Sequence, residues 1–457
     1  MKQKSVEKMG TVPIKKLMPS MGIPVIISMM LQAFYNIVDS AFVSNMNGGE
    51  SALNALTLAF PVQMMMVAIG IGTGVGVNVS LARSLGQQKR DRASRIAGNA
   101  IFLGIVITLV FILFGFFGVK FYIATQTVNP VVFDMAVQYL QICCICSVGI
   151  VLFSIFEKML QATGLTLHST IAQISGAVIN IVLDPIMIYG LLGFPAMGVA
   201  GAAYATVIGQ IVSFLIALVF HFKANKSFDK GLKYIAPQAK LIKEIYAVGL
   251  PAIIAQALMS FMTYGINIIL VRTDEALVTA YGLYYKIQQF ILFAAFGLRD
   301  TITPIVSFSY GMRNKKRIID GIKYGILYTF IIMAIGAIVL EIFAAPLCSV
   351  FRLSGTTENL CISAVRIISI GFIFAGTSIA LQGIFQALDC GISSLTISIC
   401  RQLLLVLPVA WLFTLFVAAD LSNAWIIWLT FPIAEIVTAA IAAGLMSAAY
   451  NKKVKSL

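Results

Sequence analysis

Long apolar runs recur along the whole chain, and they restrict its possible folds more than any other feature. Each is at least about 18 residues long, the length that a helix needs to cross the hydrocarbon core of a bilayer. Because 60% of the residues are hydrophobic and 11% are charged, a water-soluble fold could not bury so much apolar surface. The sequence therefore predicts an all-α polytopic membrane protein with twelve transmembrane helices. They lie near residues 16–45, 52–83, 93–118, 134–156, 165–192, 198–222, 242–272, 277–308, 317–345, 361–384, 393–418 and 424–448.

Basic residues are concentrated in alternate connecting segments. Short loops rich in Lys and Arg stay in the cytoplasm, so we expect a multi-pass membrane protein with both termini in the cytoplasm. The net charge of +14 then reflects topology and contact with anionic lipids, and it requires no nucleic-acid partner. Most of the 32 Lys and Arg residues fall on the expected cytoplasmic side, chiefly in residues 2–16, 83–95, 223–243, 313–317 and 452–455.

The two halves of the chain carry a repeated motif. Residues 22–27 read Gly-Ile-Pro-Val-Ile-Ile, and residues 249–254, at an offset of 227, read Gly-Leu-Pro-Ala-Ile-Ile. Gln161-Ala162 recurs as Gln386-Ala387 at an offset of 225. Because each half has an even number of spans, the halves are expected to be parallel repeats. The predicted parts are an N-terminal lobe, a cytoplasmic linker and a C-terminal lobe, at residues 1–222, 223–241 and 242–457.

Two aspartates lie inside predicted spans, where an ionised carboxylate costs about 2.5–3.5 kcal/mol on insertion scales. Asp39 follows Tyr35 by four residues, and Asp184 follows Asn180 by four. Residues four apart share a helix face, so these groups can converge in the first half. Two acids held close together can take up a proton or hold a sodium ion. Thr206 is a candidate for a further hydroxyl ligand, or for hydrogen bonding between helices.

Several motifs occur in an order that resembles the multidrug and toxic compound extrusion family. They cover nearly all of the first half, and the repeat extends the resemblance through the second. The most similar branch is that of the MepA-type bacterial exporters. The motifs are Pro24 with Tyr35-Asn36-Ile-Val-Asp39, then Arg83-Ser-Leu-Gly86, Glu157 with Leu160-Gln-Ala-Thr-Gly164, Ile179-Asn180-Ile-Val-Leu-Asp184-Pro185, and Gly198-Val-Ala-Gly201-Ala-Ala-Tyr-Ala-Thr206.

The resemblance implies a V-shaped pair of six-helix bundles that exports amphipathic organic cations and drugs by antiport with protons or sodium ions. Asn36 joins the ion-coupling candidates because it belongs to the same motif as Asp39. One branch of the family carries acidic ligands in spans 7 and 10. Here residues 249–271 contain no acid, and the one charged residue of span 10 is Arg366. An ion site of that kind is therefore not expected. An internally duplicated chain is expected to work as a monomer.

Glu435 is the main acid inside the spans of the second half, and two interpretations are open. It supplies a counter-charge for a cationic substrate, or it pairs with a cation embedded in the same half. Gln256, Met259 and Met262 are candidates for the substrate cavity because Met offers adaptable apolar contacts, although ordinary packing is the alternative. The embedded cations are Lys286, Arg299 and Arg401.

Pro24 and Glu157 are candidates for gating. Glu157 stands beside Lys158 at the end of a predicted span, so a solvated ion pair is an equally open interpretation. The glycine-rich stretch 70–76 lacks the Lys-Ser/Thr ending of a phosphate-binding loop, which favours close helix packing instead.

No motif indicates a metal site, an organic cofactor or a catalytic site. Cys143, Cys144 and Cys146 lack the spacing of metal ligands, and we expect them to be small buried residues. Without a nucleophile–base pair, an enzyme is not expected. A flippase for lipid-linked precursors stays an alternative, because such a protein needs a basic cavity and embedded cations are present in the second half.

Overall fold

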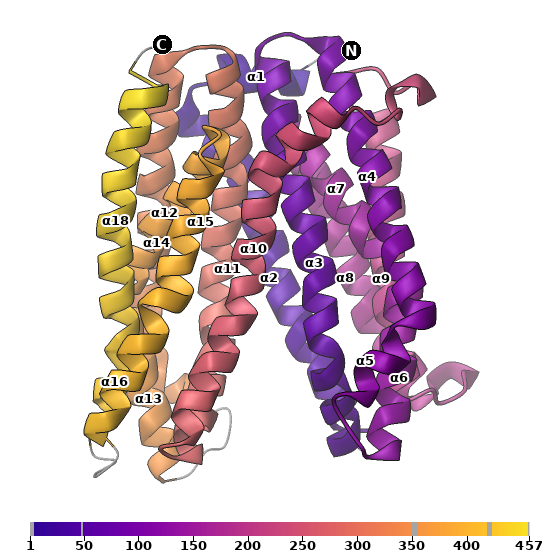
Figure 1. The fold of residues 1–457 in the computed structure, drawn as a ribbon, viewed down its shortest axis with the longest axis vertical. Helices are drawn as coiled ribbons and strands as arrows, with labels where there is room; N and C mark the ends of the chain where they lie inside the picture. Colours follow the sequence, from indigo (N-terminus) through magenta and orange to yellow (C-terminus); the bar gives the residue numbers. More distant parts are fainter. Residues whose placement is uncertain (1–3, 47–48, 350–354, 418–422, 456) are drawn as a thin grey trace. The chain divides into compact units, whose positions relative to one another are not determined.

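The described chain is almost entirely helical (Figure 1). The computed structural model describes residues 4–46, 49–349, 355–417, 423–455 and 457. The first half contains α1 (Lys4–Thr11), α2 (Ile14–Ser44), α3 (Gly49–Gly86), α4 (Arg90–Phe117), α5 (Val119–Ala124), α6 (Pro130–Ile145), α7 (Val148–Ala162), α8 (Thr166–Tyr189), η1 (Leu191–Gly193), α9 (Val199–Lys223) and η2 (Leu232–Tyr234). The second half contains α10 (Ala239–Val271), α11 (Glu275–Gly311), α12 (Lys315–Ser349), α13 (Thr356–Ser369), α14 (Phe372–Ala387), α15 (Gly391–Ile399), η3 (Cys400–Leu404), α16 (Val406–Val417), α17 (Trp425–Trp428) and α18 (Thr430–Lys453).

Among the described residues, ten helical segments are long and apolar enough to cross a membrane, and the number rises to twelve when each of two bent helix pairs is taken as one span. The pairs are α6 with α7, bent by 45°, and α13 with α14, bent by 53°. The sequence predicted straight spans at 134–156 and 361–384, so the bends were missed. A helix break inside a continuous apolar run leaves no trace in hydropathy. The fold class, an all-α polytopic protein, is confirmed.

Matching contacts in the two halves show the repeat at the level of single residues. Asn78 Nδ2, on α3, donates to the carbonyl oxygen of Lys158 on α7 at 3.1 Å. Thr303 Oγ1, on α11, donates to the carbonyl oxygen of Gly383 on α14 at 3.3 Å. Donor and acceptor are each displaced by 225 residues, the offset found for Gln161 and Gln386. The crossing of α3 with α7 is therefore equivalent to the crossing of α11 with α14.

A glycine faces a long cationic side chain at both of these crossings, but the two helices exchange roles. A Cβ atom on Gly74 of α3 would lie 2.8 Å from Cγ of Lys158 on α7. A Cβ atom on Gly383 of α14 would lie 2.9 Å from Cγ of Arg299 on α11. Gly74 corresponds to Arg299, and Lys158 to Gly383, by the same offset of 225. Each crossing thus accommodates one cation because the residue opposite has no side chain.

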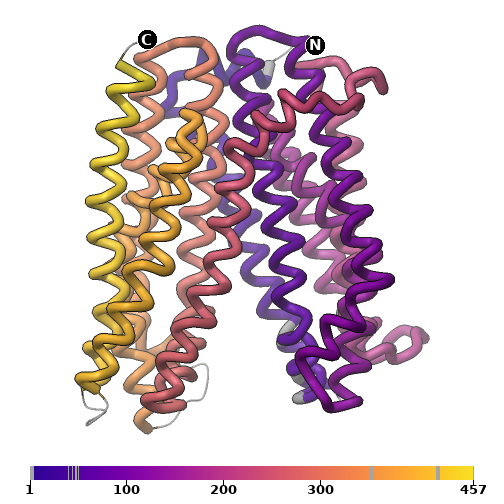
Figure 2. Tube along the Cα trace, in the orientation of Figure 1, coloured from indigo at the N-terminus to yellow at the C-terminus, as the bar shows by residue number. Residues whose placement is uncertain are grey.

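The chain divides into two units, each with its own internal packing (Figure 2). The first unit consists of Met1–Val12 and Ile27–Ile253, and the second of Pro13–Ile26 and Ile254–Leu457. Helices α2 and α10 each pass from one unit to the other, two residues after Pro24 and Pro251 respectively. Each proline lacks the amide hydrogen that would close a helical hydrogen bond, so both helices are weakened at the point where they change units.

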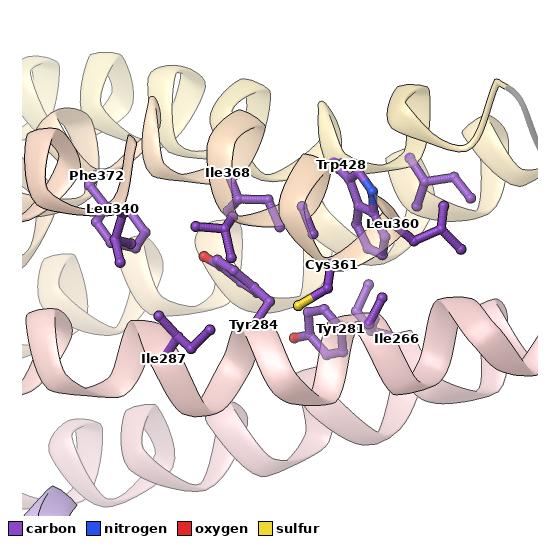
Figure 3. Close-up of a cluster of buried hydrophobic side chains, with 14 of the residues drawn as sticks. Ile266, Tyr281, Tyr284, Ile287, Leu340, Leu360, Cys361, Ile368, Phe372 and Trp428 are labelled. Carbon is purple, nitrogen blue, oxygen red and sulfur yellow. The ribbon is translucent and has the colours of Figure 1, made fainter. Parts of the chain in front are cut away.

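Each unit has an apolar core. In the first unit it is formed mainly by α3, α4, α6 and α9. In the second it joins α11 with α12, α13, α14 and α17. Figure 3 shows Tyr281 and Tyr284 of α11 packed in this second core with Cys361 and Trp428.

Basic segments meet at one end of each unit. In the first unit the segment 224–238 packs on the start of α4, where Arg90 bonds Asp229 at 2.8 Å. Arg92 of the same helix bonds Glu244 at 2.6 Å. In the second unit Lys315 Nζ donates to the carbonyl oxygen of Lys455 at 2.9 Å, which brings the start of α12 to the carboxyl end of the chain. Lys2, among the basic residues used to predict the topology, lies outside the described residues.

Candidate functional site

The candidate site of the first unit begins with the close packing of α8 on α9. A Cβ atom on Gly176 of α8 would lie 1.9 Å from Ser213 Oγ and 2.4 Å from the carbonyl oxygen of Gly209 on α9. A Cβ atom on Gly201 would lie 2.4 Å from the carbonyl oxygen of Met187. Gly201 and Gly209 are eight residues apart and therefore share a face of α9. Small residues let membrane helices approach closely, and here they bring the polar face of α8 against α9.

Three predicted site residues meet at this helix pair. Asn180 Nδ2 donates to Asp184 Oδ1 at 3.3 Å, and it lies 3.5 Å from Thr206 Oγ1 across the interface. Asp184 is completely buried, and Asn180 is 3% exposed. The sequence predicted that Asn180 and Asp184 share a face, and the hydrogen bond between them confirms it. Pro185 follows Asp184 directly. Because proline has no amide hydrogen, a carbonyl oxygen in the preceding turn of α8 lacks its usual helical hydrogen bond.

The other predicted residues lie on α2. Asp39 and Tyr35 are one turn apart on α2, and the charge of Asp39 acts on Asp184 and on the Tyr35 phenol. A hydrogen bond of 2.8 Å from Gln173 Nε2 to Gln32 Oε1 ties α2 to α8. The two acids that the sequence singled out are thus neighbours in the structure. Asn36, from the same motif, is exposed on α2.

Three oxygen atoms of this cluster are buried and have no hydrogen-bond partner within the described part of the chain. They are Asp39 Oδ1, Asn180 Oδ1 and Asp184 Oδ2. A buried acceptor left without a partner costs about 1–3 kcal/mol. The cluster therefore gains free energy from a proton or a small cation, and oxygen atoms are the ligands that a hard cation prefers. Among the described residues, no group of three His, Cys, Asp or Glu side chains is arranged to hold a metal ion.

Several neutral polar residues of this region were not predicted from the sequence. Gln32 precedes Tyr35 by three residues and Asp39 by seven, a spacing that indicates one helix face. Gln63 Nε2 donates to the hydroxyl of Tyr139 at 3.1 Å, and this tyrosine also lies within reach of the Asp39 charge. Polar residues inside an apolar run were the available signal for all of them.

Glu157 is buried, so its interpretation as a solvated ion pair was wrong. Glu157 is 5% exposed and Lys158 is 1% exposed. Gln161 links them, since Lys158 Nζ donates to Gln161 Oε1 at 3.1 Å and Gln161 Nε2 donates to Glu157 Oε1 at 3.0 Å. The reason is that α7 continues to Ala162, and all of its residues from Val151 onward are buried.

In the second unit, Glu435 pairs with Arg401. Arg401 Nε lies 2.6 Å from Glu435 Oε1, so the alternative of an internal ion pair describes this structure. Gln256, Met259 and Met262 lie on α10 and are half-buried, and Met262 packs against the core of the unit. In the described residues, the side-chain hydrogen bonds of Glu435 join it to Arg401 and to none of these three.

Other candidates have structural roles. The glycines of the stretch 70–76 pack against neighbouring helices, as the sequence predicted: a Cβ atom on Gly70 would lie 3.2 Å from Ser154 Oγ, and one on Gly72 would lie 2.7 Å from the Ile253 amide nitrogen. Cys143 and Cys144 are buried and Cys146 is half-buried. Pro24 lies within α2 and is half-buried.

A family model matches most of the chain. The MatE model covers residues 24–186 and 251–412, one stretch in each half. Among curated proteins, the Multidrug export protein MepA of Staphylococcus aureus (strain bovine RF122 / ET3-1) is 23% identical over 397 residues, which is 87% of this chain and 86% of that protein. The protein of the same name from Staphylococcus saprophyticus is 23% identical over 394 residues, 86% of each chain.

Solved structures resemble this chain over nearly its whole length. One is described as the outward-facing conformation of a multidrug resistance MATE family transporter of the MOP superfamily; it has a TM-score of 0.91 and 25% identity and covers 98% of this chain and 99% of its own. Another, a MOP superfamily transporter from Pyrococcus furiosus, has a TM-score of 0.90, 25% identity and the same coverage, and it is described as having a binding pocket of reverse polarity that suggests a different function.

Proposed function

Because this chain belongs to the MatE family of membrane transporters, we propose that it exports amphipathic organic cations by antiport with protons or sodium ions. The cation class is inferred from the negative sign of the two acids in the first unit, and the name of the staphylococcal relatives, Multidrug export protein MepA, supports export as the direction. The proposed location is the bacterial inner membrane, with both termini in the cytoplasm and one chain as the working transporter.

The acid pair of the first unit carries this proposal. The charge of Asp39 acts on Asp184, and each acid has a buried oxygen without a partner in the described residues. A proton or sodium ion on the pair removes one of its two negative charges, and its departure restores the full negative charge for a cationic substrate. The driving ion and the cationic substrate compete for the same negative charge. The transporter therefore exchanges one for the other and does not carry both together. Asn180 and Tyr35 orient the carboxylates, and Thr206 positions Asn180; Asn36 is kept as a candidate ligand.

Alternating access requires elements that change conformation between two states. Pro24 and Pro251 precede the points where α2 and α10 change units, which makes these helices suited to bending. Glu157 is proposed to act in gating because it belongs to a buried polar network near the end of α7. The substrate is proposed to contact Glu435, Gln256, Met259 and Met262 in the second unit.

A flippase for lipid-linked precursors is less well supported by the charges of the second unit. Such a substrate carries a pyrophosphate and needs cations that are free to bind it. Arg299 is neutralised by Asp300 at 2.9 Å, and Arg401 by Glu435 at 2.6 Å. Both of these embedded cations are therefore already paired.

Ion release on substrate binding tests the proposal. Purified protein in weakly buffered detergent solution is mixed with ethidium, first without sodium and then with sodium bound. We expect cation binding to release protons in the first case or sodium ions in the second, and the Asp39→Asn/Asp184→Asn variant to release neither. The Asp134→Asn variant is the control, because Asp134 is exposed on α6. Ethidium binding without release of either ion from the unsubstituted protein would contradict antiport.

A further inference from the structure

A second polar cluster lies in the second unit, where the helical run from Gly391 to Val417 departs from α-helical geometry. Residues 400–404 form the π-helical turn η3, closed by a hydrogen bond of 3.1 Å from the Leu405 amide to the Cys400 carbonyl. Pro408 follows and cannot donate to the carbonyl of Leu404, and its ring crowds that carbonyl. Irregular turns of this kind occur often at functional sites. Here the turn carries Arg401.

The ion pair of Arg401 leaves Glu435 only partly satisfied. Arg401 Nε lies 2.6 Å from Glu435 Oε1, and the two side chains are 11% and 15% exposed. The second carboxylate oxygen, Oε2, is buried and has no hydrogen-bond partner in the described part of the chain. A carboxylate in low dielectric is stabilised most by a planar cation that bonds both oxygens. Glu435 thus retains an unused acceptor beside a guanidinium.

Aromatic rings cluster one helical turn before Glu435. Phe431 precedes Glu435 by one turn of α18, and its ring stacks on Tyr281 with centroids 5.6 Å apart and an interplanar angle of 16°. The ring of Tyr284 lies 6.4 Å from that of Phe431, and its hydroxyl donates to Gln288 Oε1 at 2.6 Å. A carboxylate with adjoining aromatic rings is the combination that binds delocalised organic cations.

We propose that Glu435 and these rings form a cation subsite that Arg401 occupies in this structure, and that substrates bearing an amidinium or guanidinium group compete with Arg401 for it. The inference rests on the proposed function and adds a substrate class to it. Arg401 is a tethered example of the ligand, because its guanidinium already sits against Glu435. A planar N–H cation can replace both its charge and its hydrogen bonds. A quaternary ammonium supplies the charge but has no N–H group to donate.

Binding of a matched pair of probes tests the subsite. Benzamidinium and phenyltrimethylammonium carry one positive charge on the same ring, and their dissociation constants are measured on the purified full-length protein. We expect Arg401→Gln to strengthen benzamidinium binding relative to the quaternary probe, because the competitor is removed. Glu435→Gln removes the negative charge for both probes, but only benzamidinium also loses a charge-assisted hydrogen bond, so we expect its binding to weaken about tenfold more than that of the quaternary probe.

Two further variants keep the test decisive. Arg401→Gln leaves Glu435 without its partner and can impair folding, so the Arg401→Gln/Glu435→Gln variant, which has no buried charge, is measured as well; we expect it to lose the preference for benzamidinium. The Arg299→Gln/Asp300→Asn variant removes another buried ion pair of the same unit and should keep the wild-type ratio. An unchanged ratio in both Glu435 variants would overturn the subsite, even if ion release shows antiport. Altered ratios without ion release would leave the subsite standing and remove the antiport proposal.

Discussion

Lys158 is a charged residue with almost no exposed surface, and its stem fills space that Gly74 leaves open. Removing one partner of a buried charge cluster costs about 3–5 kcal/mol, because the remaining charge loses its compensation. At the equivalent crossing of the second half the cation comes from the opposite helix, as Arg299, and the glycine is Gly383. What both crossings require is one cation and one glycine, whichever helix supplies each.

An exchange variant tests this requirement. Lys158→Gly should lower the melting temperature because Glu157 is left buried without the cation, and Gly74→Lys should lower it because two long side chains cannot share the crossing. The variant with both substitutions restores one cation and one glycine, so we expect it to be more stable than either single variant, as a double-mutant cycle on coupled residues predicts. Thermal unfolding in detergent measures this. A double variant no more stable than the worse of the single variants would show that the helices are not interchangeable.

At this scale the acids were the easiest residues to predict from sequence. An ionised group inside a span is costly, so Asp39 and Asp184 were conspicuous, and helical spacing correctly placed Asn180 on the same helix face as Asp184. Gln32 and Gln173 were missed because a neutral amide costs far less and occurs in many spans. The burial of Glu157 was missed because the apolar run that precedes it ends near Lys158. The side chains of other helices nevertheless cover both residues.

At the scale of elements, contact between α8 and α9 depends on glycine. Gly176→Ala places a methyl group 1.9 Å from Ser213 Oγ and 2.4 Å from a backbone oxygen, so the helices must separate. We expect a loss of several degrees in melting temperature, corresponding to about 1–3 kcal/mol, together with weaker cation export because Thr206 moves away from Asn180. Gly444→Ala on α18 is the matched control: nothing lies within 4 Å of its Cβ, and alanine favours a helix by about 1 kcal/mol. Equal melting temperatures for the two variants would contradict this packing.

The pairing of α12 with α13 is tested by two thiols. Cys348 and Cys361 are both buried, and their sulfur atoms lie 3.1 Å apart. Mild oxidation with diamide should therefore link them, with loss of two alkylatable thiols and a cross-linked peptide detected by mass spectrometry. Cys348→Ser should abolish the product, whereas Cys400→Ser should not. If diamide gives no 348–361 peptide in unfractionated digests, the two helix ends are not adjacent.

Element positions followed well from hydropathy, but irregularities within elements did not. The apolar runs located every span to within several residues, because bilayer thickness fixes their length. The bends between α6 and α7 and between α13 and α14 depend on packing. At the second bend Gly371 packs closely against Pro432, because a Cβ atom on Gly371 would lie 3.0 Å from the Cα atom of Pro432. The π-helical turn had a local signal in Pro408, which was not used.

For the whole molecule, the even number of spans in each half predicts a common side for the termini and the linker. Basic segments meet at one end of the first unit and, separately, at one end of the second. Reporter fusions after Lys230 and after Leu457 should both report the cytoplasm, because short basic segments are retained there. A fusion at Val128, which is fully exposed between α5 and α6, should report the outside. Opposite locations for Lys230 and Leu457 would overturn the parallel repeat.

The fold class, the repeat and the family resemblance could be predicted from the sequence, because all three depend on long patterns. The exchange of residues between units could not. Ile26 and Ile253 end the stretches that cross over, and no change in composition marks either position. The coupling ion also does not follow from sequence, since an acid pair suits a proton and a sodium ion alike.

Gradient-driven uptake into proteoliposomes tests the central claim, coupling by Asp39 and Asp184, most directly. Inside-out vesicles receive a proton gradient or a sodium gradient separately, and accumulation of ethidium is followed for the wild type, Asp39→Asn, Asp184→Asn, the double variant and the Asp134→Asn control. We expect one gradient to drive uphill accumulation in the wild type and the control. Each single variant should lose it with an unchanged or higher melting temperature, because a buried charge is removed. The double variant should lose little more, since residues that act as one unit are not additive. Normal accumulation in the double variant would contradict the account.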